Sequence, residues 1–288
     1  TQDLDTNAKK PVMVWFHGGG FYNGSSIEGV AYDGKNLSEY GDVVVVTVNH
    51  RLNVLGYMDL SDYGEDYQYS GNCGTADLVA SLKWVKENIA NFGGDPDNVT
   101  IFGQSGGGCK VLNMFATSEA EGLFDQAVVQ SGGEGHIDQD IAKKVTAKTL
   151  EILGISDNEV EQLKEVPYDT LDAAATEAQK QVGEELGTSV GWSPVLDEDY
   201  LHTDFLDWTN DVPVMVGSVF GEFNCWTALD PNETNKNSWT EEEVDAKLTE
   251  KYGDKAEAVK EAFLKAYPEK SACDAYYVCL LYTSDAAD

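Results

Sequence analysis

With 288 residues, 42% of them hydrophobic, and no apolar run near the ~20 residues of a membrane span, the chain is expected to be soluble and to bury a sizeable core. Its 51 acidic and 19 basic residues leave a net charge of −32, which argues against binding to nucleic acid or to an anionic membrane. We attribute this charge to solubility or to a saline niche rather than to the attraction of cationic substrates, and it leaves compartment and oligomeric state open.

Five short apolar runs predict the strands of a mostly parallel sheet. They are unbroken rather than alternating, as expected where both faces of a sheet are covered. In chain order they occupy residues 12–16, 43–48, 99–102, 126–130 and 212–216. Apolar residues at helical spacing predict a helix over residues 76–90, ended by the glycines that follow Phe92. Alternating strands and helices indicate an α/β fold.

The second half of the chain is predominantly helical in pattern. Residues 139–183 predict two or three amphipathic helices, and we assign this helical excursion to about residues 137–190. Thr240, followed by three glutamates, predicts a capping box that opens another helix. Since there is no repeat and no low-complexity linker, we expect residues 1–278 to form one α/β domain.

The run Gly103-Gln104-Ser105-Gly106-Gly107 follows the third predicted strand and precedes a segment that can form a helix. This is the pattern of a nucleophile elbow, in which a tight strand-to-helix turn exposes a serine hydroxyl above the sheet. Gly103 and Gly107 suit a crowded turn, and the Gly106 N–H can point at an oxyanion. The alternative is a glycine-rich turn without chemistry.

The first predicted strand leads directly into His17-Gly18-Gly19-Gly20-Phe21. Three successive glycines cost backbone entropy, so they occur where backbone N–H groups must approach something closely. A strand followed by this sequence is typical of the oxyanion loop of lipases and esterases. A flexible surface loop is the alternative, and the presence of both motifs in the right order disfavours it.

These motifs resemble the type B carboxylesterase family, which includes bacterial para-nitrobenzyl-type esterases and the cholinesterases. The resemblance is continuous over residues 11–133, thins through the helical excursion, and returns at 192–226. Its most specific stretches are residues 15–21, 43–56, 71–77 with 82–89, and 91–107. It implies an α/β-hydrolase fold. The hormone-sensitive-lipase-like family also carries the triple glycine, but the sequence Phe-Gly-Gly-Asp-Pro at residues 92–96 favours type B.

The resemblance also implies a triad acid and a substrate pocket. Glu222 takes the place of the acid, although the family usually has Asp-Glu-Gly there and this chain has Gly221 and Phe223 on either side. The alternative is a solvated loop carboxylate. Phe21, Trp192 and Phe220 are candidate pocket walls, and core packing is an equally good explanation for all three.

The base of the triad is missing, because all four histidines precede Glu222, whereas the histidine comes last in this fold. His17 is expected to shape the glycine loop, and His50 ends a strand. His136 and His202 are expected to be solvated. The resemblance places the true base beyond the end of the chain. It also implies that Arg51, the only arginine, pairs with an acidic residue outside the chain.

Residues 279–288, Cys-Leu-Leu-Tyr-Thr-Ser-Asp-Ala-Ala-Asp, resemble the in-frame translation of a transposase adapter used to prepare sequencing libraries. We expect them to be a non-native tail and exclude them from the fold. Residues 1–10 read as a polar loop that enters a strand, without an initiator methionine or a signal peptide. We therefore expect a fragment of a bacterial enzyme, incomplete at both ends and with little or no turnover. The remaining cysteines and histidines show no metal-ligand spacing and predict neither metal nor cofactor.

For the intact parent the resemblance implies a serine carboxylic-ester hydrolase that acts on small-molecule esters. Ser105 attacks the ester carbonyl, and Glu222 orients the missing histidine. The N–H groups of Gly19, Gly20 and Gly106 stabilise the tetrahedral oxyanion. The alternative is a non-catalytic binding or adhesion relative on the same fold.

Overall fold

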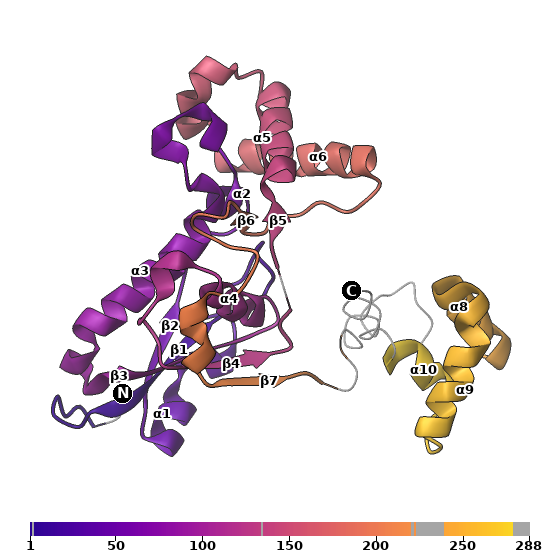
Figure 1. Cartoon of the computed structure of the whole chain (residues 1–288), viewed down its shortest axis with the longest axis horizontal. Coiled ribbons are helices and arrows are strands. Elements are labelled where there is room, and N and C mark those ends of the chain that lie inside the picture. Colours follow the sequence, from indigo (N-terminus) through magenta and orange to yellow (C-terminus); the bar gives the residue numbers. More distant parts are fainter. Residues whose placement is uncertain (2, 134, 220–221, 223–238, 279–288) are drawn as a thin grey trace. The chain divides into compact units, whose positions relative to one another are not determined.

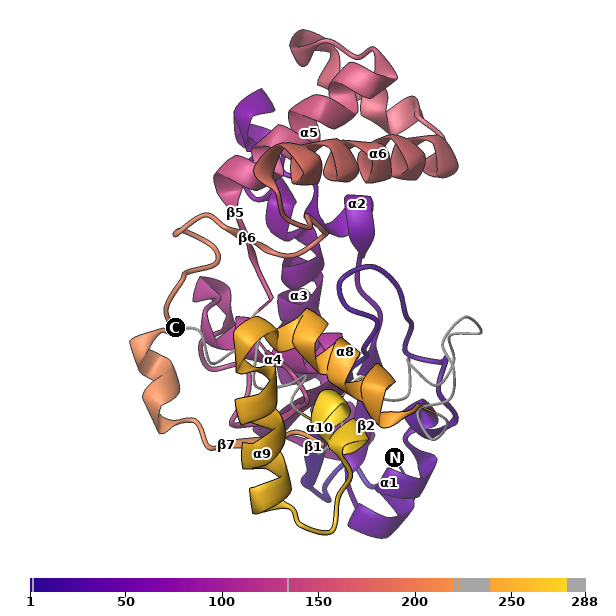
Figure 2. The ribbon, with the colours of Figure 1, turned by 90° about the vertical axis from the view of Figure 1, so that its right-hand side faces the viewer.

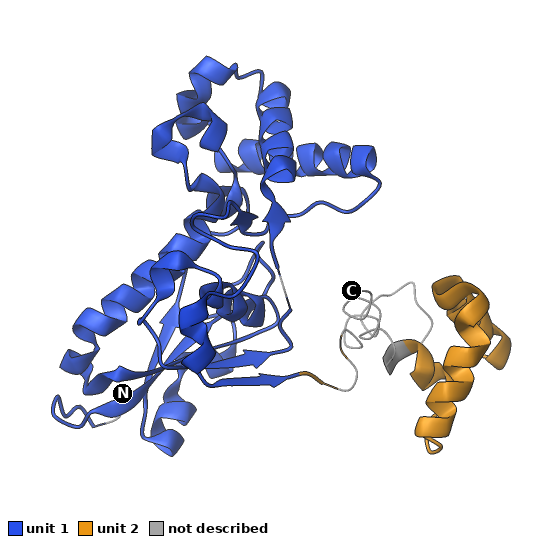
Figure 3. Cartoon of the chain, in the orientation of Figure 1, with its two compact units in different colours: residues 1–217 blue, residues 218–288 orange. Residues whose placement is uncertain are grey.

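The computed structural model describes residues 1–288 except 2, 134, 220–221, 223–238 and 279–288 (Figure 1). The chain divides into two compact units, Thr1–Gly217 and Ser218–Asp288 (Figure 3). One domain over residues 1–278 stays a prediction. The predicted tail, 279–288, and the candidate pocket residue Phe220 lie outside the described residues.

The first unit is built on a sheet of five described strands that all pair in parallel, in the order β2–β1–β3–β4–β7. Their bounds are β1 Lys10–Phe16, β2 Val44–Val48, β3 Gly94–Gln104, β4 Gln126–Gln130 and β7 Val214–Gly217. All five predicted strands are confirmed, with ends shifted by a few residues. The predicted α/β-hydrolase fold with a mostly parallel sheet is also confirmed.

Two helices pack with this sheet to form the main core. α3 (Cys73–Asn88) contributes Leu78, Leu82 and Val85, all nearly inaccessible to solvent. α4 (Gly106–Phe115) follows β3 directly and packs against β1, β3 and β4. The predicted helix over residues 76–90 is therefore confirmed, and Gly93 follows it in the left-handed region, at φ 81°.

Strand β7 departs from the expectation of a sheet covered on both faces. It lies at one edge of the described sheet and pairs only with β4. Its apolar side chains are exposed, with relative accessibilities of 69% for Met215 and 68% for Val216. An apolar run predicts a strand correctly, but burial depends on which neighbours cover it.

The helical excursion begins and ends at a two-stranded parallel sheet of β5 (Ile137–Asp138) and β6 (Val195–Leu196). Between them, α5 (Gln139–Leu153) and α6 (Tyr168–Leu186) pack against each other, with a 3-10 segment, Asp157–Glu165, connecting them (Figures 1 and 2). The predicted helices are confirmed. The short helices α1 (Lys35–Gly41) and α2 (Asn53–Tyr57) contact β2 and α3 respectively.

The described part of the second unit contains α8 (Glu241–Tyr252), α9 (Ala256–Ala266) and α10 (Ala272–Val278). The predicted capping box is present at the start of α8. The Glu243 N–H donates to the Thr240 hydroxyl at 3.3 Å, and the Thr240 N–H donates to the Glu243 carboxylate at 2.7 Å. Val244 and Leu248 of α8 form the small core of this unit.

Candidate functional site

Ser105 sits at the junction of β3 and α4 in a backbone conformation that serines rarely adopt, with φ 57° and ψ −127°. Such a conformation costs about 1–3 kcal/mol and persists only where the surroundings hold it. Here the Ser105 N–H donates to the Gln130 carbonyl of β4 at 2.8 Å, and the Ser105 carbonyl accepts from the Cys109 N–H at 3.0 Å. The turn that precedes α4 is thus tied to the sheet and to the helix.

Crowding, rather than unusual dihedral angles, explains the two flanking glycines. A Cβ on Gly103 would lie 2.4 Å from the Gly107 carbonyl group, and a Cβ on Gly107 would lie 2.1 Å from the Phe16 carbonyl oxygen. Neither distance is compatible with a side chain. The Gly-x-Ser-x-Gly pattern therefore lets β1, β3 and α4 approach one another closely.

The triple-glycine loop lies against this elbow. Phe16 pairs with Gly103 in the sheet, so the loop that follows β1 starts beside the end of β3. A Cβ on Gly106 would lie 2.5 Å from both the Cα and the N of Gly20. Gly19 and Gly20 have positive φ angles, 86° and 60°. The three residues predicted to donate to the oxyanion thus belong to one backbone cluster, and their role stays a prediction.

His17, at the start of the loop, is completely buried and acts on the loop itself. Its Nδ1–H donates to the Gly18 carbonyl at 2.8 Å, and its ring stacks on that of His50 with centroids 4.8 Å apart. Burial lowers the pKa of His17 and, with the nearby Lys110 charge, lowers the pKa of His50 to about 3. The lowered pKa values of both rings favour their neutral forms near pH 7, and the role of His17 in shaping the glycine loop stays a prediction.

Glu222 and Ser105 belong to different units of the chain. In its own unit the Glu222 carboxylate accepts the Val219 N–H at 2.9 Å. The pairing of Glu222 with a catalytic histidine stays a prediction.

Phe21 and Trp192 are 5% and 6% exposed and belong to one apolar cluster with residues of α2, α5 and α6. The Phe21 ring meets the Tyr57 ring edge-on, with centroids 5.3 Å apart. Core packing, the alternative considered from the sequence, accounts for these contacts. A role as pocket walls stays a prediction for Phe21, Trp192 and Phe220.

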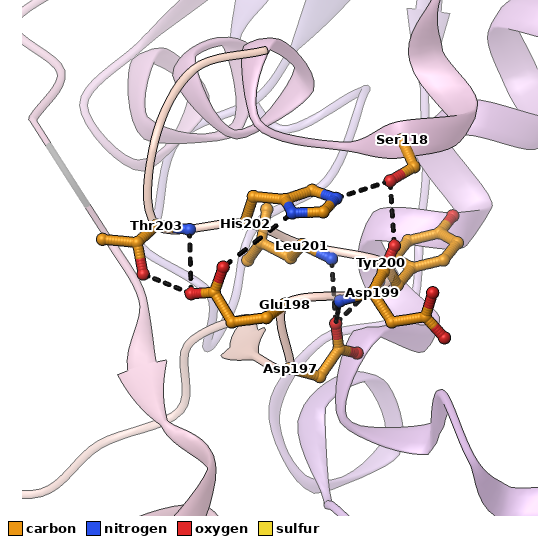
Figure 4. Close-up of polar contacts among 8 residues, drawn as sticks. All are labelled: Ser118, Asp197, Glu198, Asp199, Tyr200, Leu201, His202 and Thr203. Carbon is orange, nitrogen blue, oxygen red and sulfur yellow. Dashed lines mark hydrogen bonds and ion pairs between the residues drawn. The ribbon is translucent and has the colours of Figure 1, made fainter.

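His202 is not simply solvated, as the sequence suggested, but belongs to a polar cluster beside a second serine, Ser118 (Figure 4). The Ser118 hydroxyl donates its proton to the Asp199 carbonyl at 2.8 Å. Because that proton is already used, the His202 Nε2–H is the donor in the 2.7 Å contact with the Ser118 oxygen. Glu198 lies on the other side of the ring, with its carboxylate 3.9 Å from Nδ1. Sequence order hid this cluster because Ser118 and His202 are 84 residues apart.

In the described part of the chain, no histidine forms a hydrogen bond with the Ser105 hydroxyl. His50 is committed elsewhere, since its Nδ1–H donates to the Arg51 carbonyl at 3.0 Å. The Arg51 guanidinium pairs with Asp77 within the chain, through contacts of 2.7 and 2.9 Å. Its pairing with an acid outside the chain stays a prediction.

The described residues contain no group of three or more histidine, cysteine, aspartate or glutamate side chains placed to hold a metal ion. Among the same residues, no helix combines the length and the apolar character that crossing a bilayer requires.

Comparison with known proteins agrees with this geometry. Para-nitrobenzyl esterase of Bacillus subtilis is 45% identical over 172 residues, which cover 59% of this chain and 35% of the relative. Mouse neuroligin-2 is 45% identical over 131 residues, or 45% of this chain and 15% of the relative. An esterase from Clostridium hathewayi, described as able to hydrolyse aliphatic aromatic polyesters, has a similar structure with 46% identity and a TM-score of 0.80.

The structural match covers 98% of this chain and 57% of the Clostridium protein, so the chain spans little more than half of that relative's length. The sequence profile of the carboxylesterase family matches residues 1–277, nearly the whole chain. The elbow and the triple-glycine loop both lie inside this match, and the chain belongs to the carboxylesterase family.

Proposed function

We propose that the protein is a serine hydrolase that cleaves carboxylic esters through an acyl-enzyme. The observation that carries this proposal is the backbone cluster at the elbow. Ser105 is held in a strained turn, and the Gly106 backbone approaches that of Gly20 so closely that a Cβ on Gly106 would lie 2.5 Å from the Gly20 Cα and N. A strained serine beside closely packed glycine amides is what attack on a carbonyl and stabilisation of the resulting oxyanion require.

In this mechanism the Ser105 hydroxyl attacks the ester carbonyl carbon, its proton passes to a base, and the alcohol leaves. Water then attacks the acyl-enzyme in the same way. The N–H groups of Gly19, Gly20 and Gly106 stabilise the tetrahedral oxyanion, and each donor contributes roughly 3 kcal/mol to transition-state stabilisation. Glu222 orients the base and stabilises its charged form.

The base is the part of the mechanism that this chain does not supply at Ser105. His17, His50 and His202 each have another partner. A serine hydroxyl without a base is a poor nucleophile at neutral pH. We therefore predict little or no turnover for the 288-residue chain alone, with the histidine contributed by residues outside it.

We propose small esters as substrates, with aromatic esters as the first choice. The names of the Bacillus and Clostridium relatives, a para-nitrobenzyl esterase and an esterase acting on aliphatic aromatic polyesters, support this choice. The net charge of −32 makes nucleic acid an unsuitable partner.

The test is hydrolysis of p-nitrobenzyl acetate and p-nitrophenyl acetate by two proteins, the 288-residue chain and any longer product of the source gene. We expect the longer product to turn over, and Ser105→Ala to abolish that turnover. Ser118→Ala is the matched control and is expected to leave turnover unchanged. Hydrolysis that survives Ser105→Ala would overturn the proposal.

The second candidate is a non-catalytic binding protein on the same fold. The match to neuroligin-2, whose name is not that of an esterase, means that family membership alone does not decide the activity. The strained conformation of Ser105 favours catalysis, because a binding protein has no use for that strain. A longer gene product that lacks hydrolysis altogether would favour binding.

A further inference from the structure

Lys110 is a buried lysine that the proposed mechanism does not use. It lies on α4, four residues after Gly106, and is only 1% exposed. In the described part of the chain it has no carboxylate within ion-pair distance. Burying a cation without an anion is costly, so its place in the core needs a compensating contact.

The contacts of Lys110 fall at both ends of the triple-glycine loop. Its Nζ donates to the His17 carbonyl at 2.9 Å, immediately before the three glycines. The same atom lies 5.6 Å from the ring centroid of Phe21, immediately after them. One side chain from the nucleophile helix therefore touches both residues that bound the loop.

Residues 106, 107 and 110 lie on one face of α4, and all three meet the same segment of chain. Gly106 approaches the backbone of Gly20, and Gly107 approaches the Phe16 carbonyl. Among the described residues, Lys110 adds the only side-chain hydrogen bond between this helix face and the loop. Gly106 and Gly107 permit the close approach of α4 to the loop, and Lys110 can hold the two together.

We propose that Lys110 is a positioning residue, which clamps the His17 carbonyl and the Phe21 ring so that the Gly18–Gly20 amides stay aligned with the elbow. This inference rests on the proposed function only for its effect on catalysis. The clamp itself is a property of the fold.

The hydrogen bond of the clamp does not need a charged lysine, whereas the attraction to the Phe21 ring does. Burial lowers the pKa of Lys110 to about 7, and Cys109 and Glu28 counter this only in part. Both the ammonium and the neutral amine carry N–H donors, so the bond to the His17 carbonyl can form in either state.

The test is hydrogen–deuterium exchange of the full 288-residue chain, followed in peptides that cover residues 16–24. Lys110→Met keeps an unbranched apolar side chain that is one atom shorter and removes the donor. We expect the loop to exchange about ten- to a hundredfold faster, the range for a lost hydrogen bond to a charged group. Lys110→Arg restores donors and is expected to restore most of the protection. Lys83→Met, on the exposed side of α3, is the control and is expected to change nothing.

Unchanged exchange of residues 16–24 in Lys110→Met would overturn the proposal, as would equal loss of protection in the Met and Arg variants while α3 stays protected. If Lys110→Met loses protection throughout the first unit, the Lys110→Arg variant decides the question. Protection of residues 16–24 in Lys110→Arg supports the clamp, whereas fast exchange of these residues in an otherwise protected Lys110→Arg protein refutes it.

In a longer product that hydrolyses esters, Lys110→Met should lower kcat about tenfold or more at unchanged KM. Absent hydrolysis would count against the proposed function and leave the exchange result standing.

Discussion

Ser105 and Ser118 show two ways to place a serine. Ser105 is surrounded by backbone, with the glycines of two loops packed around it and no histidine bonded to its hydroxyl in the described residues. Ser118 has a histidine at 2.7 Å and a nearby glutamate, so the three residue types of a catalytic triad are present there. Yet the Ser118 proton is given to a carbonyl, so His202 cannot take it as a base.

A short serine–histidine distance therefore does not by itself identify a nucleophile. What matters is where the hydroxyl proton goes and whether backbone donors surround the oxygen that will become negative. By these criteria the cluster of Ser118, Glu198 and His202 fastens the 197–203 segment to the end of α4. The elbow at Ser105, with glycine backbone packed around it, is the site that we propose for the chemistry.

The largest expected effect comes from filling the crowded elbow. Gly107→Ala places a Cβ 2.1 Å from the Phe16 carbonyl oxygen, and we expect the free energy of unfolding to fall by about 2–4 kcal/mol in urea titrations. Gly133→Ala is the control, since its Cβ would meet nothing within 4 Å. Equal stability of the two variants would mean that the elbow is not close-packed.

The histidines beside the elbow should make stability depend on pH. The pKa of His50 is lowered to about 3 in the folded state, so the unfolded chain takes up a proton first as the pH falls. The stability that comes from keeping His50 neutral is present above pH ~6.5 and is lost progressively as the pH falls from there toward 3. Between pH 6.5 and 5 we expect the wild type to lose about 1.5 kcal/mol more than His50→Gln. Parallel pH curves for the two proteins would contradict a buried neutral His50.

The Ser118 cluster should matter to stability alone. Ser118→Ala removes bonds to His202 and to the Asp199 carbonyl, and we expect the free energy of unfolding to fall by about 1 kcal/mol. Ser105→Ala, the matched variant at the elbow, is expected to change it by less than about 0.5 kcal/mol. The reverse ranking would mean that the Ser118 contacts contribute nothing.

The last expected effect is a gain in stability. Because Ser105 has φ 57° and ψ −127°, Ser105→Gly relieves backbone strain and should raise the free energy of unfolding by roughly 1 kcal/mol. Comparing the thermal and urea unfolding of Ser105→Gly with that of Ser105→Ala separates this gain from the effect of losing the hydroxyl. A glycine variant no more stable than the alanine variant would show that the turn stores no strain.

Much of the fold and part of the site could be predicted from the sequence because their signals are local. Unbroken apolar runs indicated all five strands of the described sheet, and the repeat around Leu82 indicated α3. Thr240 and Glu243 make their capping box within one helical turn. The Gly-x-Ser-x-Gly pattern indicated the elbow, because a tight turn restricts the residues that can form it.

The tertiary structure alone decided the contacts between distant segments. The bond from Lys110 to the His17 carbonyl spans 93 residues, and the bond between His202 and Ser118 spans 84. The exposure of Met215 on β7 likewise depends on the neighbours of an edge strand. Sequence patterns report the backbone preferences of a few adjacent residues, whereas these contacts depend on which loops the parallel sheet brings to the same edge.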